Sequence, residues 1–578
     1  MRNEYPRPDF RRKEWLSLNG QWDFAFAGKE KQAIEVPFVF QSKLSGIHQP
    51  CDCDYITYSR SMQVPSQWKG RRIMLHFGAV DWRASVLING SQVAVHEGGS
   101  TPFSVDITNW LTWGTEELCV EVYDPLADET LPRGKQFWRS KPEFIWYTPS
   151  SGIWQSVWLE PVSDTHWSKL HFTPNIDDGT VEISWRLSEQ SALPCRCNFI
   201  INLRDKVFFE GSVLTANLEG KLTVDIFGNK ILHGPFHYGG LCWSPESPTL
   251  FDVEASLFAN DVLCDRLDTY FGMRKVEIIG NKIYLNNFPY YQKLVLDQGY
   301  WKDGLLTAPD EQCFKDDILH SKAMGFNGCR KHEKAEDPVF LYWADKLGYL
   351  VWSAMPSFIS YSDTSVIHFI NEWHSVIQRD YNHPCIIAWE MLNESWGVPD
   401  VARNSQQQDF VRTLFHLAKS LDKTRLVVDN DGWEQTDSDI CALHSYKHGA
   451  EDNVKQKEHF KNCLSSLDGL LSGAIMDHLP YAQGWDYKGK PILLSEFGGI
   501  TMDTGSDSWG YTQATDETEF LATYNRMIEA IYASPHLCGF CYTQLTDVQQ
   551  EKNGLLDEYH APKVNPEKIR TIHEKFHY

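Results

Sequence analysis

The sequence predicts a multidomain protein in which a β jelly roll and an immunoglobulin-like β-sandwich precede a C-terminal (β/α)8 TIM barrel. The pattern of apolar segments changes along the chain, and this change predicts the order of the domains. Up to about residue 275, short apolar segments alternate with turns, whereas beyond it similar segments alternate with amphipathic stretches. The length of 578 residues also exceeds what one hydrophobic core usually organises. We expect three domains, over residues 1–162, 163–275 and 276–578.

The first domain has the pattern of strands joined by turns. Segments 72–77, 84–88 and 117–122 are short, rich in apolar or β-branched residues, and often alternating. Asn89-Gly90 follows the second segment and predicts a hairpin, because both residues accept the positive φ angles of a tight turn. Such a segment is typical of a jelly roll.

The second domain is also predicted to be all-β. Its clearest strand is the alternating segment 179–185. A size of about 110 residues suits an immunoglobulin-like sandwich.

The third domain is predicted to contain eight β–α units. Its candidate strands are residues 292–296, 326–330, 349–352, 385–392, 425–428, 440–443, 491–495 and 537–542. Its clearest helices are expected over residues 310–324, 365–379, 405–421 and 517–533. Eight such units in about 300 residues are typical of a (β/α)8 barrel, whose active site lies at the C-terminal ends of the strands.

Two carboxyl groups follow strands of this barrel. Glu394 comes after the fourth strand, between Trp389 and Trp396, and Glu496 comes after the seventh. A lone carboxylate at a strand end is usually a solvated loop residue, so the hypothesis rests on the pair. A protonated acid and an ionised carboxylate facing each other are what glycoside cleavage needs, and their separation decides whether configuration is retained.

Composition excludes several classes of partner. The net charge of −23 would repel nucleic acid and anionic membranes. The sequence contains no run of about 18 apolar residues, which is the length needed to span a bilayer. The amino terminus is charged and lacks a secretory signal, so we expect a cytoplasmic protein with reduced cysteines. The 22 tryptophans favour carbohydrate, since an indole ring offers a flat apolar face to a sugar.

The chain resembles glycoside hydrolase family 2, which includes β-galactosidases, β-glucuronidases and β-mannosidases. The resemblance extends over nearly the whole chain. It is carried by the fragments 15–22, 77–81, 96–99, 148–155 and 382–394, together with Asn89-Gly90 and Pro102-Phe103.

The resemblance implies roles for particular residues. Glu394 would be the general acid/base and Glu496 the nucleophile of a retaining double displacement. Asn393 would bond the sugar 2-hydroxyl, and Tyr446 would touch the nucleophile. The remaining residues expected to line the sugar pocket are His444, Trp433, Asp297, His332 and Trp396.

The residues expected to bind the sugar differ from those of well-known relatives. Family β-glucuronidases hold the substrate carboxylate with an Asn-x-Lys pair, whereas the matching residues here are Glu551, Lys552 and Asn553. We therefore expect an exo-acting β-galactosidase; an α-L-arabinopyranosidase or a β-uronidase of the same family remains an alternative.

A protein of another class is the second hypothesis. An inactive carbohydrate-binding protein would use Trp82 or Trp110 of the first domain as a sugar platform. We expect a carbohydrate partner, no metal and no cofactor, because side chains supply all the chemistry; assembly into a homo-oligomer is left open.

Overall fold

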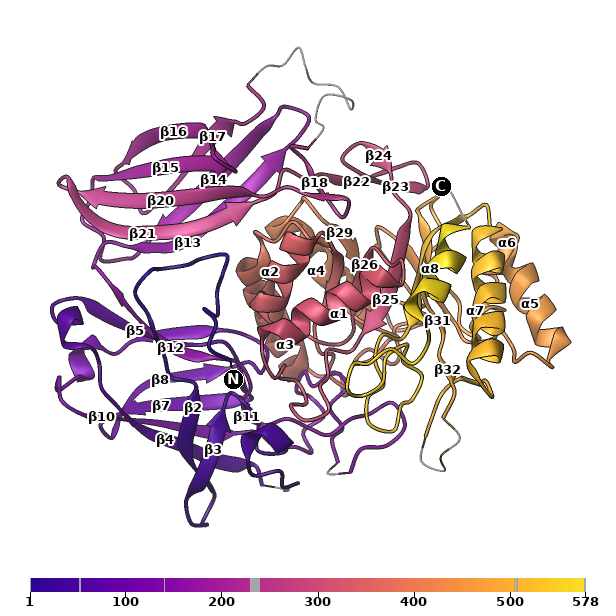
Figure 1. Ribbon diagram of the computed structural model, residues 1–578, viewed down its shortest axis with the longest axis horizontal. Coiled ribbons are helices and arrows are strands. Elements are labelled where there is room, and N and C mark those ends of the chain that lie inside the picture. The colour runs from indigo at the N-terminus through magenta and orange to yellow at the C-terminus, as the bar shows by residue number, and fades with distance from the viewer. Residues whose placement is uncertain are drawn as a thin grey trace.

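The computed structural model describes residues 2–50, 53–139, 141–228, 240–503, 505 and 508–575. Two β-domains lie along one side of the molecule and the barrel forms the other (Figure 1). The N-terminal domain and the second domain both contact the barrel, which contains the largest hydrophobic core.

The first domain is built from two antiparallel sheets. The six-stranded sheet has the order β3-β2-β4-β10-β7-β8 and the four-stranded sheet the order β1-β12-β5-β9. The strands are β1 (Leu16–Ser17), β2 (Gly20–Phe26), β3 (Gln32–Val36), β4 (Tyr55–Met62), β5 (Arg72–Phe77), β7 (Arg83–Ile88), β8 (Ser91–Glu97), β9 (Phe103–Asp106), β10 (Glu116–Tyr123) and β12 (Val157–Val162). Asn89 has a φ of 51° and joins β7 to β8, so the predicted hairpin is confirmed.

The second domain packs a three-stranded sheet on a four-stranded one. Their orders are β13-β14-β17 and β16-β15-β20-β21. The strands are β13 (Trp167–Asn175), β14 (Thr180–Leu187), β15 (Cys195–Leu203), β16 (Lys206–Thr215), β17 (Glu219–Asp225), β20 (Phe251–Ala259) and β21 (Val262–Phe271). A small sheet of β22 (Val276–Ile279), β23 (Lys282–Leu285) and β24 (Phe288–Pro289) then leads into the barrel.

The barrel has eight parallel strands in the order β29-β28-β27-β26-β25-β34-β31-β30. They are β25 (Gln292–Asp297), β26 (Gly328–Lys331), β27 (Leu350–Ala354), β28 (Ile386–Glu390), β29 (Leu426–Val428), β30 (Cys441–Ser445), β31 (Ile492–Gly498) and β34 (Leu537–Thr543). The helices outside it are α1 (Glu311–Ala323), α2 (Pro338–Leu347), α3 (Asp363–Asp380), α4 (Ser405–Leu421), α5 (Val454–Leu464), α6 (Leu467–Leu471), α7 (Glu517–Tyr532) and α8 (Pro566–Glu574).

The predicted fold class is confirmed. Each of the eight predicted barrel strands overlaps an observed one, and the four predicted helices coincide with α1, α3, α4 and α7 to within two residues. The division at residues 162 and 275 stays a prediction. In the described part of the chain, no helix has the length and apolarity needed to cross a membrane.

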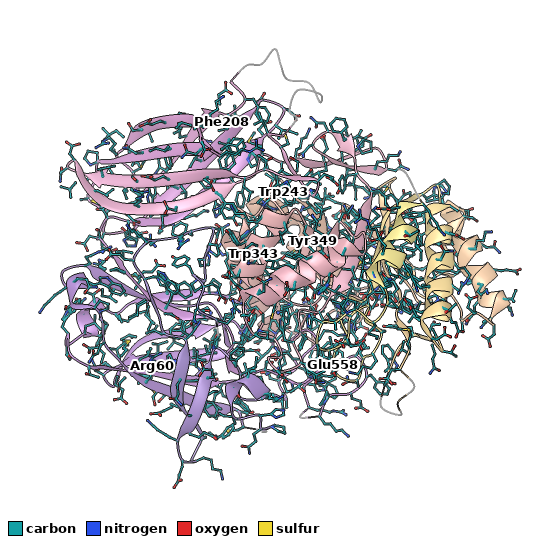
Figure 2. The ribbon with its side chains drawn as sticks, in the orientation of Figure 1. Arg60, Phe208, Trp243, Trp343, Tyr349 and Glu558 are labelled. Atoms are coloured by element: carbon teal, nitrogen blue, oxygen red, sulfur yellow. The ribbon has the colours of Figure 1, made fainter. Side chains whose placement is uncertain are left out.

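Both β-domains are fixed to the barrel by buried aromatic residues. Tyr147 and Trp154 of the first domain share an apolar cluster with Tyr300 and Leu305 of the barrel. Trp243, at the end of the second domain, is fully buried and its Nε1 donates to the carbonyl oxygen of Asp345 at 2.8 Å (Figure 2). Burial on this scale favours a fixed arrangement of the three domains.

Trp82 is not available as a sugar platform. It is 4% exposed and packs against His368 of α3, with ring centroids 5.0 Å apart. The prediction that it could stack on carbohydrate is therefore wrong, because the first domain uses this face to contact the barrel. Trp110 is 44% exposed and stays a candidate.

Candidate active site

Glu394 lies just beyond strand β28 in a tightly held turn. Its φ is 51°, in the left-handed region that costs energy for a residue with a side chain. Its backbone N–H donates to the Asp431 carbonyl at 2.8 Å, and the next N–H, that of Ser395, donates to the Asn430 side chain at 3.0 Å. These two hydrogen bonds stabilise the strained turn. The carboxyl group projects into the barrel opening, and 20% of the Glu394 side chain is exposed.

Glu496 lies within strand β31 rather than after it. The strand continues to Gly498, because residues 496–498 still pair with β30 and β34. The apolar run that predicted the strand ended at Leu494, so the sequence placed its end too early. The Glu496 side chain is 6% exposed.

The two carboxyl groups face each other. One oxygen of Glu394, one oxygen of Glu496 and one ring nitrogen of His444 all lie within 4.8 Å of one another. Retaining glycosidases hold their two carboxyl groups about 5–5.5 Å apart, whereas inverting enzymes leave about 6.5–9.5 Å for a water molecule. One oxygen of each group lies within 4.8 Å of the other, which is nearer to the first of these two ranges.

Arg330, at the end of β26, forms hydrogen bonds and ion pairs with several of these groups. It is fully buried; its Nη1 donates to Glu496 and its Nη2 to the Asn393 side-chain oxygen, each at 2.6 Å. It also forms a bidentate pair with Glu390 at 2.6 and 2.7 Å and an ion pair with Asp431 at 2.6 Å. Because Arg330 occupies the amide oxygen of Asn393, the amide nitrogen remains to donate to a ligand.

His444 stands between the two acids. Its Nδ1 contacts Glu394 at 2.7 Å, and its Nε2 lies 3.6 Å from Glu496 and 3.4 Å from Asp431. Burial alone would lower the pKa of His444, but the negative charges of Glu496 and Asp431 and hydrogen bonds to Asp431 and Glu394 raise it to about 10. The ring therefore carries a positive charge at neutral pH.

Glu496 is strongly favoured in its ionised form. Burial would raise its pKa, but the nearby charges of His444 and Arg330, together with the hydrogen bond that Tyr446 donates at 2.5 Å, lower it to about 2. The Tyr446 ring also stacks on Tyr511, with centroids 3.4 Å apart. An ionised carboxylate held by donors is suited to attack an electrophilic carbon.

Three more of the expected residues lie around this centre. His332 Nε2 lies 3.7 Å from Glu496, and burial drives the pKa of His332 well below its ordinary value, so the ring is neutral. Trp433 is partly buried against His444, with centroids 5.6 Å apart. Trp396 meets Trp146 of the first domain edge-on at 4.9 Å.

Asp297 is not brought to this centre. Its carboxylate accepts from Lys331 at 2.6 Å and from the Gly299 N–H at 2.8 Å. Side chains alternate between the two faces of a strand, so Arg330 points into the barrel while its neighbour Lys331 points towards the helices. Asp297, paired with Lys331 in register, faces the same way.

Residues of the first domain lie beside this centre, which the sequence did not predict. A loop of residues 125–150 reaches the barrel, where the N–H groups of Arg133 and Gly134 donate to the Ser357 carbonyl at 3.0 and 2.9 Å. The Tyr147 hydroxyl donates to Glu551 at 2.5 Å. No local pattern marks these residues, since only domain docking brings them to the site.

Among the residues that the structure describes, two groups of side chains have the composition of a metal site. Glu394, His444 and Glu496 form one, and Asp345, His383 and Cys385 form the other. In the second group, burial raises the pKa of the Cys385 thiol well above its ordinary value, which disfavours the thiolate that a metal requires. His383 and Asp345 already contact each other at 2.6 Å. The absence of a metal stays a prediction.

Comparisons with protein families match most of the chain. Three models of one family match: "Glycosyl hydrolases family 2, sugar binding domain" over residues 43–160, "Glycosyl hydrolases family 2" over 165–274 and "Glycosyl hydrolases family 2, TIM barrel domain" over 276–527. Together they span nearly all of residues 43–527.

Individual relatives are distant. A β-galactosidase of Thermoanaerobacter pseudethanolicus is 26% identical over 79% of this chain and 60% of its own length. A putative β-glucuronidase of Formosa agariphila is 24% identical, but the match covers 64% of this chain and 43% of that protein. A β-glucuronidase of Paenibacillus borealis is 24% identical over 97% of this chain and 96% of its own length.

Solved structures share the fold. The β-D-glucuronidase of Dictyoglomus thermophilum superposes with a TM-score of 0.80 at 18% identity, covering 99% of both chains. A β-galacturonidase from Eisenbergiella tayi bound to galacturonate gives a TM-score of 0.75 at 20% identity, covering 100% of this chain and 99% of that one. At such identities the likeness establishes the three-domain architecture alone.

Proposed function

The chain belongs to glycoside hydrolase family 2, and we propose that it is an exo-acting glycosidase that removes terminal β-linked sugars with retention of configuration. The observation that carries the proposal is the spacing of Glu394 and Glu496, whose oxygens lie within 4.8 Å of each other across the barrel opening.

In the first step Glu496 is the nucleophile. Its ionised carboxylate attacks the anomeric carbon, while Glu394 gives its proton to the glycosidic oxygen and the C–O bond to the leaving group breaks. Tyr446, which donates to one oxygen of Glu496, and Arg330, which donates to the other, orient the attack. The Asn393 amide nitrogen donates to the 2-hydroxyl of the sugar, a role supported by the bond from Arg330 to the Asn393 oxygen, which leaves the nitrogen for the ligand.

In the second step a water molecule replaces the leaving group. Glu394, now ionised, takes a proton from this water as its oxygen attacks the anomeric carbon, and the bond to Glu496 breaks. Two inversions give net retention. The positive charge of His444 beside both acids stabilises whichever of them is ionised.

Two classes of sugar remain candidates. A β-galactoside is supported by Glu551, which stands where family β-glucuronidases have the asparagine that binds the substrate carboxylate. It is also supported by the β-galactosidase relative from Thermoanaerobacter. A β-uronide is supported by relatives named β-glucuronidase. It is also supported by Lys135 of the first domain, a lysine that is 7% exposed. A panel of nitrophenyl glycosides, with the two uronides and their neutral counterparts, distinguishes the classes.

The roles of the two acids are tested by replacing Glu394 and offering azide. In Glu394→Ala we expect kcat on substrates with poor leaving groups to fall roughly 10²–10⁴-fold, because the general acid is lost. Azide should then restore turnover with activated substrates and give a glycosyl azide of β configuration. An α azide from this variant would assign the nucleophile to Glu394 instead. Glu496→Ala should lose turnover on every substrate, by roughly 10⁴-fold or more.

A further inference from the structure

We propose that Lys135, which the loop of residues 125–150 carries from the jelly roll to the barrel opening, is the anion-binding residue of the sugar pocket and selects sugars that bear a carboxylate. The inference rests on the proposed function and deepens it, since it names β-uronides as the substrate class. It assigns the choice of substrate to the first domain rather than to the barrel.

The side chain of Lys135 is mostly buried, but its ammonium group reaches solvent and contacts no counter-ion in the described part of the chain. The residue is 7% exposed. In the described part of the chain its Nζ has no carboxylate oxygen within 4.0 Å and no hydrogen bond. An ammonium group that reaches solvent and has no carboxylate in contact is available to an anionic ligand. A ligand carboxylate would supply the missing partner.

Two aromatic rings hold the ammonium group in place. Nζ lies 5.5 Å from the ring centroid of Trp146 and 5.6 Å from that of Tyr147, both distances at which a ring attracts a cation. The Lys135 carbonyl also accepts a hydrogen bond from the Tyr147 N–H at 2.8 Å. The side chain is therefore positioned before any ligand binds, which limits the entropy lost on binding.

The nearest carboxyl groups, Glu551 and Glu333, interact with the charge of Lys135 through space but form their hydrogen bonds with other donors. Glu551 accepts from the Tyr147 hydroxyl at 2.5 Å and from the Asn553 amide at 3.1 Å. Glu333 accepts from the Ser357 N–H at 2.6 Å and from its hydroxyl at 2.8 Å. Burial raises the pKa of both acids, to about 7 for Glu333, which weakens their negative charge near neutral pH.

Contacts through single residues link Lys135 to the catalytic centre. Trp146, on which its ammonium lies, touches Trp396, two residues after Glu394. The charge of Lys135 is also felt by His332, whose ring lies 3.7 Å from Glu496. These contacts place Lys135 on the side of the barrel opening where Trp396 and His332 lie.

The loop that carries Lys135 is docked closely on the barrel. Gly134 has a φ of 56°, and a Cβ atom there would lie 2.3 Å from the Glu333 carbonyl oxygen. Only glycine allows this approach. Asn553 stands where the resemblance would place the lysine of the family's carboxylate grip, so Lys135 supplies from another domain the charge that position 553 lacks.

The test compares each uronide with its neutral counterpart in the full-length protein. Nitrophenyl β-D-glucuronide and β-D-galacturonide are assayed beside the corresponding glucoside and galactoside, with wild type, Lys135→Met and Lys135→Arg. We expect Lys135→Met to lower kcat/KM on the preferred uronide roughly 30-fold or more and on its neutral counterpart less than about threefold. Lys135→Arg should keep most of the preference, because it keeps the charge.

Lys552→Met is the matched control. This lysine lies in the same region but is already paired with Glu558 at 2.9 Å, so its removal should leave the uronide preference unchanged (Glu558 is labelled in Figure 2). Melting temperatures of all variants show whether they fold. An equal loss on charged and neutral sugars in Lys135→Met, or no loss, would overturn the proposal.

Two further outcomes separate this inference from the proposed function. If wild type cleaves neutral glycosides but no uronide, the assignment of Lys135 fails and the retaining glycosidase stands. If wild type cleaves no glycoside, the proposed function fails, and calorimetry with free glucuronate and galacturonate decides the role of Lys135. Binding that disappears in Lys135→Met supports it, and lack of binding to wild type contradicts it.

Discussion

At the scale of single residues, His444 is the cation that contacts both of the proposed catalytic acids. It is 1% exposed, and its two ring nitrogens face Glu394 on one side and Glu496 and Asp431 on the other. A cation in this place lowers the pKa of Glu496 and favours the ionised form that the proposed nucleophile requires.

Replacing His444 should change the acid limb of the pH profile. In wild type the pKa of Glu496 is about 2, so its ionisation limits kcat/KM only at very low pH. In His444→Gln that pKa should rise towards its ordinary value, because the largest opposing charge is gone. We expect the acid limb of kcat/KM to move up by more than about one pH unit. An unmoved limb in a variant that folds normally would show that His444 does not support the nucleophile.

At the scale of elements, helix α3 forms the contact between the barrel and the jelly roll. Glu372 on this helix is 2% exposed, and its Oε2 accepts from the Ser100 N–H at 2.9 Å. Burial, with a smaller contribution from the charge of Asp81, raises the pKa of Glu372 to about 8. The acid is therefore held in its neutral form across the domain contact.

This helix contact predicts a pH-dependent stability. The folded pKa of Glu372 lies above its unfolded value, so the folded state binds the proton more tightly and stability falls as pH rises from about 4.5 to about 8. Glu372→Gln keeps a neutral side chain that can still accept from Ser100. We expect it to match wild type near pH 5 and to exceed it by on the order of 3 kcal/mol above pH 8. Chemical unfolding at the two pH values measures this, and an equal difference at both would contradict it.

Local sequence patterns predicted the elements better than their mutual contacts. Apolar runs bounded by turn residues marked all eight barrel strands, and carboxylates at two strand ends marked Glu394 and Glu496. The same reasoning misplaced Asp297, because a strand-end position does not tell which face a side chain takes. It also missed Arg330 as the hub of the site, although it lies at the end of a strand that was predicted.

At the scale of the whole molecule, the proposed sugar pocket draws on residues of two domains. Strands β26, β28, β30 and β31 bring Arg330, Glu394, His444 and Glu496 together, while the jelly roll adds Lys135, Trp146 and Tyr147. More than 180 residues separate these sets along the chain, and only the packed domain contact joins them. Sequence patterns describe a residue's own neighbourhood, so they could not predict this arrangement.

The configuration of the first product tests the central claim most directly. Proton NMR during hydrolysis of the best nitrophenyl β-glycoside shows which anomer of the free sugar forms before mutarotation. Two carboxyl groups within 4.8 Å predict that the β anomer forms first and the α anomer appears only later. If the α anomer formed first, water would have attacked directly and Glu496 would not be the nucleophile.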